Sequence, residues 1–103
     1  MAEKPPDRTV RAVPRFLKSK RRLTPAVQTE VDNQVKVLLD DPLKGEMKKG
    51  TLKGVRVKKF NGENRQYLLA YYFFPKLNVI EMLDVGVHEN FYTGLEGYLK
   101  DRP

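Results

Sequence analysis

The sequence of 103 residues contains no cysteine and only one histidine, His88. Without cysteine the chain can form neither a disulfide framework nor a thiolate metal site. One histidine and scattered acidic residues do not make a metal-ligand cluster, so we expect no metal and no other cofactor. The acidic residues Glu81 and Asp84 lie three positions apart in a predicted strand and should face opposite sides of it.

A long apolar run is also missing. No stretch reaches the roughly 20 residues that span a bilayer, and residues 1–8 contain no apolar segment of the kind found in signal peptides. These absences predict a cytoplasmic protein without a membrane partner. Because residues 1–8 are polar and contain two prolines, we expect a flexible basic tail followed by a single domain at residues 9–103.

The sequence is rich in positive charge and has a formal net charge of +7. Residues 1–23 carry eight Lys/Arg against two acidic residues, and residues 44–59 carry seven against one. Charge gathered into two segments is typical of proteins that bind polyanions such as nucleic acid. The alternative interpretation is a solvated surface that only keeps the protein soluble.

The segment from Gly54 to Tyr92 contains three strand patterns in succession. Residues 55–60 begin by alternating apolar and basic side chains, which predicts a half-buried strand with a row of cations. Residues 66–74 are apolar on both faces and predict the central strand, and residues 79–85 predict a third. Asn61-Gly62 predicts a hairpin between the first two, because both residues tolerate positive φ. We therefore expect an antiparallel three-strand meander.

Two helices are predicted before this meander. Thr24-Pro25 is a typical helix start, and apolar residues at helical spacing continue the pattern to Asp40. Residues 9–13 predict a short edge strand, and residues 15–22 predict a basic helix. The expected buried contacts of that helix are Phe16, Leu17 and Leu23. The alternative interpretation continues the strand to Leu17.

The remaining segments predict a loop and a last helix. Residues 43–53 contain two glycines and four lysines, which indicates a flexible basic loop without the glycine spacing of a P-loop. Asn90 is expected to cap a short final helix through its side chain. Gly94 and Gly97 weaken that helix by about 1 kcal/mol each relative to alanine. Its apolar stripe consists of Phe91, Leu95, Tyr98 and Leu99.

Together these segments predict an α+β fold. A short N-terminal strand and the three-strand meander would form an antiparallel β-sheet. This sheet would pack against an N-terminal helical hairpin and be followed by a short C-terminal helix.

The order of these elements resembles the RelE/ParE superfamily of bacterial toxins over about residues 9–99. The segments that carry the resemblance are Asp41-Pro42, Gly50-Thr-Leu-Lys-Gly54, Arg56-Val57-Lys58, Gln66-Tyr-Leu-Leu-Ala-Tyr71 and Gly86-Val87-His88-Glu89-Asn90-Phe91-Tyr92. The last one is similar to a C-terminal signature of glycine, a basic residue and tyrosine. Family nucleases often carry arginine at the centre of the strand that here contains Leu68, whereas this chain has Arg65 just before it.

The resemblance implies a ribosome-dependent, metal-independent messenger-RNA endonuclease that is held inactive by a cognate antitoxin. Its partners would be that antitoxin, the ribosome and messenger RNA, with operator DNA contacted only through the antitoxin. We expect the antitoxin to lie across the sheet and the terminal helix. The alternatives are a toxin that inhibits DNA gyrase without nuclease activity and a basic RNA-binding module unrelated to toxins.

RNA can be cleaved without metal if its 2′-hydroxyl attacks the adjacent phosphate, which requires a base, an acid and cations. The turn at Gly86 should present His88, a possible acid or base, beside the cations of the first strand of the meander. The predicted catalytic residues are His88, Arg65, Tyr92, Arg56 and Lys58. The predicted RNA- and ribosome-binding residues are Lys48, Lys49, Lys53 and Lys59. The alternative is that His88 only satisfies a loop carbonyl and Tyr92 packs in the core.

Overall fold

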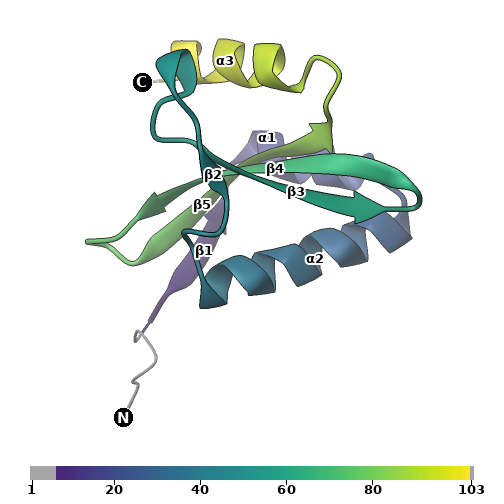
Figure 1. Cartoon of the computed structure of the whole chain (residues 1–103), viewed down its shortest axis with the longest axis horizontal. Coiled ribbons are helices and arrows are strands. Elements are labelled where there is room, and N and C mark those ends of the chain that lie inside the picture. The colour runs from purple at the N-terminus through teal and green to yellow at the C-terminus, as the bar shows by residue number, and fades with distance from the viewer. Residues whose placement is uncertain (1–6, 103) are drawn as a thin grey trace.

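A five-stranded mixed sheet separates two of the helices in the computed structural model, which describes residues 7–102 (Figure 1). The elements in chain order are β1 (Thr9–Ala12), α1 (Pro14–Arg21), α2 (Pro25–Asp40), β2 (Glu46–Met47), the 3₁₀ turn η1 (Gly50–Leu52), β3 (Arg56–Gly62), β4 (Arg65–Phe74), β5 (Val79–Val87) and α3 (Phe91–Asp101). The predicted tail lies outside the described residues except for its last two. One of these, Arg8, donates hydrogen bonds to Asn78 and to the Leu39 carbonyl.

The predicted meander is confirmed, and β4 is its central strand in the order β1-β5-β4-β3-β2. Two details of the predicted sheet are wrong. First, β1 pairs with β5 in the parallel direction, so the sheet is mixed. Second, the predicted loop at residues 43–53 contributes the short edge strand β2 and the turn η1. A two-residue strand is too short to show alternation, and the alternation of β1 does not indicate the direction of its partner.

The hairpin between β3 and β4 is confirmed, but its turn lies two residues later than predicted. Asn61 and Gly62 belong to β3 and pair with Gln66 and Arg65. The positive φ values fall instead on Glu63 and Asn64, at 48° and 64°. Such a pair of left-handed residues matches the right-handed twist of the strands that it connects.

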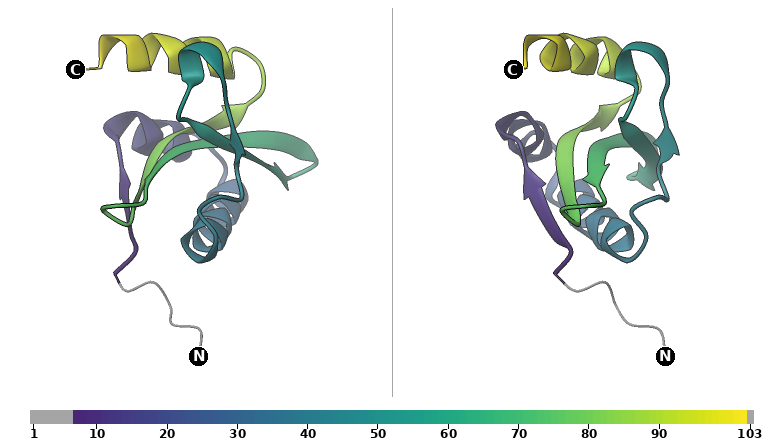
Figure 2. Two further views of the ribbon diagram at one scale, coloured as in Figure 1. Left: turned by 60° about the vertical axis from the view of Figure 1, so that its left-hand side comes forward. Right: turned by 90° about the vertical axis from the view of Figure 1, so that its left-hand side faces the viewer.

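The helices lie on both sides of the sheet. Figures 1 and 2 show α2 on one side and α3 on the other. The face toward α2 includes Tyr71, which bonds to the segment that follows this helix. The face toward α3 includes Gly86, where an added Cβ atom would lie 3.6 Å from Phe91 of that helix. Side chains reach these two faces alternately along the strands, apart from one irregularity in β5.

The start of α2 is as predicted, because the Thr24 side chain accepts a hydrogen bond from the Val27 amide at 3.3 Å. Helix α1 begins at Pro14 and buries Phe16, so the alternative of a continued strand is wrong. Leu17 is 47% exposed, against the prediction that it is buried. A helix that packs on β5 with one side leaves its opposite side in solvent.

The start of α3 differs from the prediction in its capping. Asn90 occupies the N-cap position, but its side chain makes no capping hydrogen bond. Its φ is 59°, in the left-handed region that asparagine tolerates better than most residues. Asn90 therefore allows the chain to turn into α3 but does not cap this helix with its side chain. The predicted apolar stripe is present, with Phe91 and Leu95 buried and Tyr98 and Leu99 packed against the core.

Strand β5 contains a bulge at Leu83, because Asp84 pairs with Ala70 while Met82 pairs with the next residue, Tyr71. The extra residue shifts the alternation, so the prediction that Glu81 and Asp84 face opposite sides is wrong. Arg102, which binds Glu81, and Arg15, which binds Asp84, both lie over the ring of Tyr98. That shared ring places the two carboxylates on the face toward α3.

These two carboxylates tie separate elements to β5. Glu81 Oε2 accepts from Arg11 Nε of β1 at 3.1 Å and from Arg102 Nη2, just after α3, at 2.9 Å. Asp84 accepts from Arg15 Nε at 3.0 Å and from the Ser19 hydroxyl at 2.6 Å, both in α1. The Glu81 side chain is only 5% exposed. Ion pairs and hydrogen bonds thus attach β1, α1 and the end of α3 to β5, in addition to apolar contacts.

Glu81 predicts how stability responds to acid. Burial alone would raise its pKa, but Arg102 and Arg11 outweigh burial and hold that pKa below the ordinary value of 4.5. A carboxyl whose pKa is lowered by folding stabilises the protein above its unfolded pKa, and this contribution disappears as pH falls through the folded pKa. We therefore expect Glu81→Gln to flatten the fall of unfolding free energy below about pH 4.5.

Urea unfolding between pH 7 and pH 3 measures this effect. The control is Glu89→Gln, a change of the same type at an exposed position. It should keep the wild-type acid dependence. An unchanged slope in Glu81→Gln would contradict the stabilising role of the ionised carboxylate.

Candidate functional site

His88 lies directly after β5, in the turn that leads to α3, and is exposed. Its ring meets the Tyr92 ring edge to face, with centroids 5.5 Å apart and planes at 78°. Within residues 7–102 the imidazole makes no hydrogen bond to the protein, so the alternative that it satisfies a loop carbonyl finds no support here. Only the backbone oxygen of His88 is used, by the Phe91 amide at 3.1 Å. The imidazole is therefore available to an external group.

Lys48 approaches Tyr92 from the opposite edge of the sheet. It continues β2 by donating its amide to the Val55 carbonyl, and its ammonium lies 5.2 Å from the centroid of the Tyr92 ring. The same ammonium bonds Glu46 Oε1 at 2.7 Å. This bond is the main reason why the pKa of Lys48 is raised and that of Glu46 is lowered. Both groups are thus kept charged.

Glu46 was not among the residues predicted from sequence. The available signal was that it is the only acidic residue in the basic segment 44–59. What the sequence did not show was that the segment forms an edge strand, in which Glu46 and Lys48 lie on one face two positions apart. That face is the one covered further along by α3.

Lys59 belongs to the same face. It pairs with Leu68, which pairs in turn with Gly86, so the three form one row across the sheet two residues before His88. Lys59 is exposed. It also helps to lower the pKa of Glu46 through its charge. A shallow groove of about 330 Å³ runs along this edge and is lined by Lys44, Glu46, Lys48, Val57, Lys58 and Lys59.

The structure does not bring Arg56 and Lys58 to His88, against the expectation from sequence. Arg56 pairs with Tyr71 and donates to the Gly45 carbonyl at 2.8 Å, on the face toward α2. Lys58 lies on that face too, where its ammonium bonds the side chain of Gln34 in α2. Alternation along β3 therefore directs these two side chains away from the histidine, although Lys58 still lines the groove at the edge of the strand.

The other predicted cations are spread over the surface. Arg65 is exposed at the first position of β4, opposite Gly62, whose Cα faces Val27 of α2. It therefore shares the face of Arg56 rather than that of His88. Lys49 and Lys53 are exposed on either side of η1. Their positions suit contacts with a large anionic surface and not a precise arrangement with His88.

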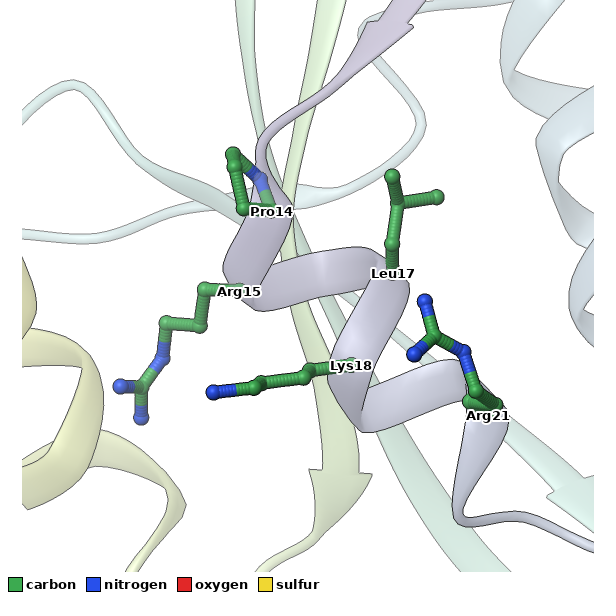
Figure 3. A pocket seen from close by; sticks show the side chains of 5 residues that line it. All are labelled: Pro14, Arg15, Leu17, Lys18 and Arg21. Carbon is green, nitrogen blue, oxygen red and sulfur yellow. The ribbon is translucent and has the colours of Figure 1, made fainter.

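A second basic surface lies on the outer side of α1. It forms a groove of about 440 Å³. Figure 3 shows the side chains that line this groove: Pro14, Arg15, Leu17, Lys18 and Arg21. Arg15 is engaged by Asp84, whereas Lys18 and Arg21 project from the helix into solvent. Cations in the last turn of a helix are stabilised by the helix dipole, so Lys18 and Arg21 can also be explained by the stability of α1.

Two kinds of site find no counterpart in the described part of the chain. Residues 7–102 contain no group of three His, Asp or Glu side chains placed to hold a metal ion. No helix within the same residues is long and apolar enough to cross a membrane.

The chemistry available on the α3 face combines five groups. The exposed imidazole of His88 can donate or accept a proton in general acid–base chemistry. Tyr92 offers a hydroxyl, and Lys48 and Lys59 offer positive charge beside an exposed carboxylate. The groove is open and lined mainly by lysine, which fits an extended anionic polymer better than an enclosed small molecule.

Comparison with protein families gives a match over most of the chain. The model of the ParE-like toxin of type II bacterial toxin-antitoxin system matches residues 10–96. A comparison with curated proteins found none that matches.

Solved structures show a similar fold. A mutant of the E. coli toxin RelE in the free state is 19% identical with a TM-score of 0.72, covering 91% of this chain and 97% of that chain. RelE in the intact E. coli RelBE toxin-antitoxin complex is 20% identical with a TM-score of 0.66, covering 79% and 96%. A chain of the Mycobacterium tuberculosis RelBE2 toxin-antitoxin complex is 21% identical with a TM-score of 0.67, covering 78% of this chain and 90% of that chain. At these identities the likeness concerns the fold alone.

Proposed function

This chain belongs to the ParE-like toxins of type II bacterial toxin–antitoxin systems, and we propose that it acts as a ribosome-dependent, metal-independent messenger-RNA endonuclease. The observation that supports this activity most is the meeting of His88, Tyr92, Lys48 and Glu46 at one open, basic edge of the sheet. An inhibitor that works only by binding requires no exposed imidazole beside a held cation. The proposed cellular location is the cytoplasm, where translated messages are found.

In the proposed reaction the 2′-oxygen of one nucleotide attacks the adjacent phosphorus. The 2′-hydroxyl proton passes to a base, the bond from phosphorus to the 5′-oxygen breaks, and an acid protonates that oxygen. The products are a 2′,3′-cyclic phosphate and a 5′-hydroxyl. His88 can carry out one of the two proton transfers, and the charges of Lys48 and Lys59 can stabilise the phosphorane. The catalytic assignment of Arg56, Lys58 and Arg65 remains a prediction without support from their positions.

The proposed partners are a cognate antitoxin, the ribosome and messenger RNA, with operator DNA reached only through the antitoxin. Two of the similar structures are toxin–antitoxin complexes by name, which supports the first of these. An antitoxin segment across the sheet and α3 would cover Lys48, Lys59 and His88 together. Opposite charge on that segment would make association fast and sensitive to salt.

Induced expression in bacteria tests the proposal against gyrase inhibition. If the protein is a nuclease, mapped messenger-RNA ends should show new cuts in translated messages, with 5′-hydroxyl termini. A DNA-damage response with intact messages would instead identify a gyrase inhibitor. Binding of RNA with neither outcome would indicate a basic RNA-binding module.

The exposed lysines around η1 are expected to contribute docking. Lys49→Gln with Lys53→Gln should weaken ribosome binding severalfold, because each lysine that contacts a phosphate releases counterions. The dependence of the logarithm of affinity on the logarithm of salt concentration should flatten by roughly 1.5. Sedimentation with ribosomes at several salt concentrations measures both.

The matched control removes the same charge at two other exposed lysines, Lys36→Gln with Lys76→Gln, in α2 and in the β4–β5 turn. It should leave the salt dependence nearly unchanged. A Lys49/Lys53 variant that sediments normally but cuts slowly would show that these lysines act in chemistry rather than in docking.

A further inference from the structure

Lys48 differs from its neighbour Lys49 in being held in place by other side chains. Its side chain is 23% exposed and bonds Glu46 at 2.7 Å, whereas the next residue, Lys49, is exposed. Its ammonium lies over the Tyr92 ring, 5.2 Å from the centroid. An ammonium over an aromatic face is attracted by the electrons of the ring. The position of Lys48 is therefore fixed by the Glu46 carboxylate, two residues earlier, and by the Tyr92 ring of α3.

The Tyr92 ring is correspondingly occupied. Lys48 covers one face, and the rings of His88 and Phe91 both meet Tyr92 at steep angles with centroids 5.5 Å away. Phe91 is buried, so the ring is anchored to the core at the start of α3. A nucleic-acid base could stack on the covered face only after displacing Lys48.

We propose that Tyr92 is a positioning residue for Lys48, which it holds beside His88 so that the ammonium contacts the phosphate of the bound RNA. This role deepens the proposed function and rests on it. It differs from base stacking, in which the ring itself would contact RNA. It also moves Lys48 from general docking to the centre of the site.

The physical advantage of such a grip is preorganisation. A free lysine side chain loses conformational entropy when it is fixed. In this arrangement folding has already fixed Lys48, so RNA meets a cation in place. Glu46 is exposed, so its carboxylate can turn toward solvent when a phosphate arrives at the ammonium.

The grip can be measured in the purified protein without any RNA. In nuclear magnetic resonance spectra the ε-methylene protons of Lys48 should be shifted upfield by the ring current of Tyr92. Tyr92→Phe should keep the shift, because the ring remains, and Tyr92→Leu should abolish it. The ε-methylene protons of Lys49 serve as the internal control and should not change. An unshifted Lys48 in the wild-type protein would overturn the proposal.

A double-mutant cycle tests the role in cleavage. Tyr92→Leu and Lys48→Met should each slow cleavage of ribosome-bound message by about 10²–10³-fold, the usual effect of removing one group that stabilises the transition state. The double variant should be no slower than the slower single variant, because Tyr92 acts through Lys48. Tyr92→Phe, which keeps the ring over Lys48, should lose much less activity than Tyr92→Leu. Thermal unfolding confirms that each variant is folded.

Two outcomes of the cycle separate the hypotheses. Losses that multiply in the double variant would mean that Tyr92 contacts RNA by itself, which overturns the positioning role. If the wild-type protein cuts no message, the proposed endonuclease function fails. The same cycle is then measured as binding of a short RNA oligonucleotide, where non-additive losses support the positioning role and additive losses reject it.

Discussion

His88→Ala should slow cleavage of ribosome-bound messenger RNA by about 10²–10⁴-fold, the usual contribution of one proton-transfer residue. The side chain is exposed and makes no hydrogen bond within the described residues 7–102, so its removal should leave the fold intact. Antitoxin binding should also remain, since the basic edge of the sheet keeps its charge. Tyr92→Phe should lose much less, because it keeps the ring that holds Lys48.

The measurement is a single-turnover cleavage assay on intact ribosomes over pH 5 to 9, with thermal unfolding as the check on folding. Glu89→Ala is the matched control, since it alters the next exposed residue of the same turn. It should cut at nearly the wild-type rate. If His88→Ala cuts at the wild-type rate, the proton-transfer role is wrong and His88 is a structural residue of the turn.

Tyr71→Phe, which removes one hydroxyl group, should cause a large loss of stability in the segment that leads to Glu46 and Lys48. The Tyr71 hydroxyl donates to the Pro42 carbonyl at 2.7 Å and accepts from the Gly45 amide at 2.9 Å, in a fully buried position. Removing it leaves two buried backbone groups unpaired, which should lower the free energy of unfolding by about 2–4 kcal/mol. Glu46 directly follows Gly45, so the loss should also loosen the start of β2.

Urea unfolding at neutral pH measures this effect, and hydrogen exchange at residues 43–48 reports the local loosening. Tyr72→Phe is the control because its ring is half-buried on the opposite face of the same strand. It should change stability by less than about 0.5 kcal/mol. Gly45→Ala tests the same contact from the other side, since an added Cβ atom would lie 2.7 Å from the Tyr71 hydroxyl. Equal stability of the two tyrosine variants would contradict this account.

The meander and its flanking helices were predictable because local patterns encode them. Thr24-Pro25 sets the start of α2, and the apolar run of β4 can be accommodated only in the centre of a sheet. The bulge at Leu83 was not predictable, because an extra residue leaves no mark in an apolar strand. The parallel direction of β1 depends on the path through α1 and α2, which alternation does not describe.

The candidate site was only partly predictable for a related reason. Alternation in β3 shows which residues share a face, but not which helix covers that face. Val57 and Lys59 share the face toward α3, and Lys58 shares the opposite face with Phe60. The face of β3 that carries Val57 and Lys59 therefore belongs to the candidate site. The face that carries Arg56 and Lys58, which the sequence analysis assigned to catalysis, does not. Glu46 and Lys48 were not recognised as a pair because β2 is only two residues long, too short for alternation to reveal a strand.

The parallel pairing of β1 with β5 also determines when the sheet can be completed on a nascent chain. Arg8 meets Asn78 and Thr9 pairs with Val79, so each contact joins positions 70 residues apart. At about 5–20 residues per second, synthesis separates the two partners by several seconds. The hairpins on either side of β4 can close within microseconds of their emergence. β1 therefore waits unpaired until β5 has been made, and His88, the next residue after β5, is added only then. The edge of the sheet and the imidazole can therefore reach their final positions only after every other strand of the sheet has been synthesised.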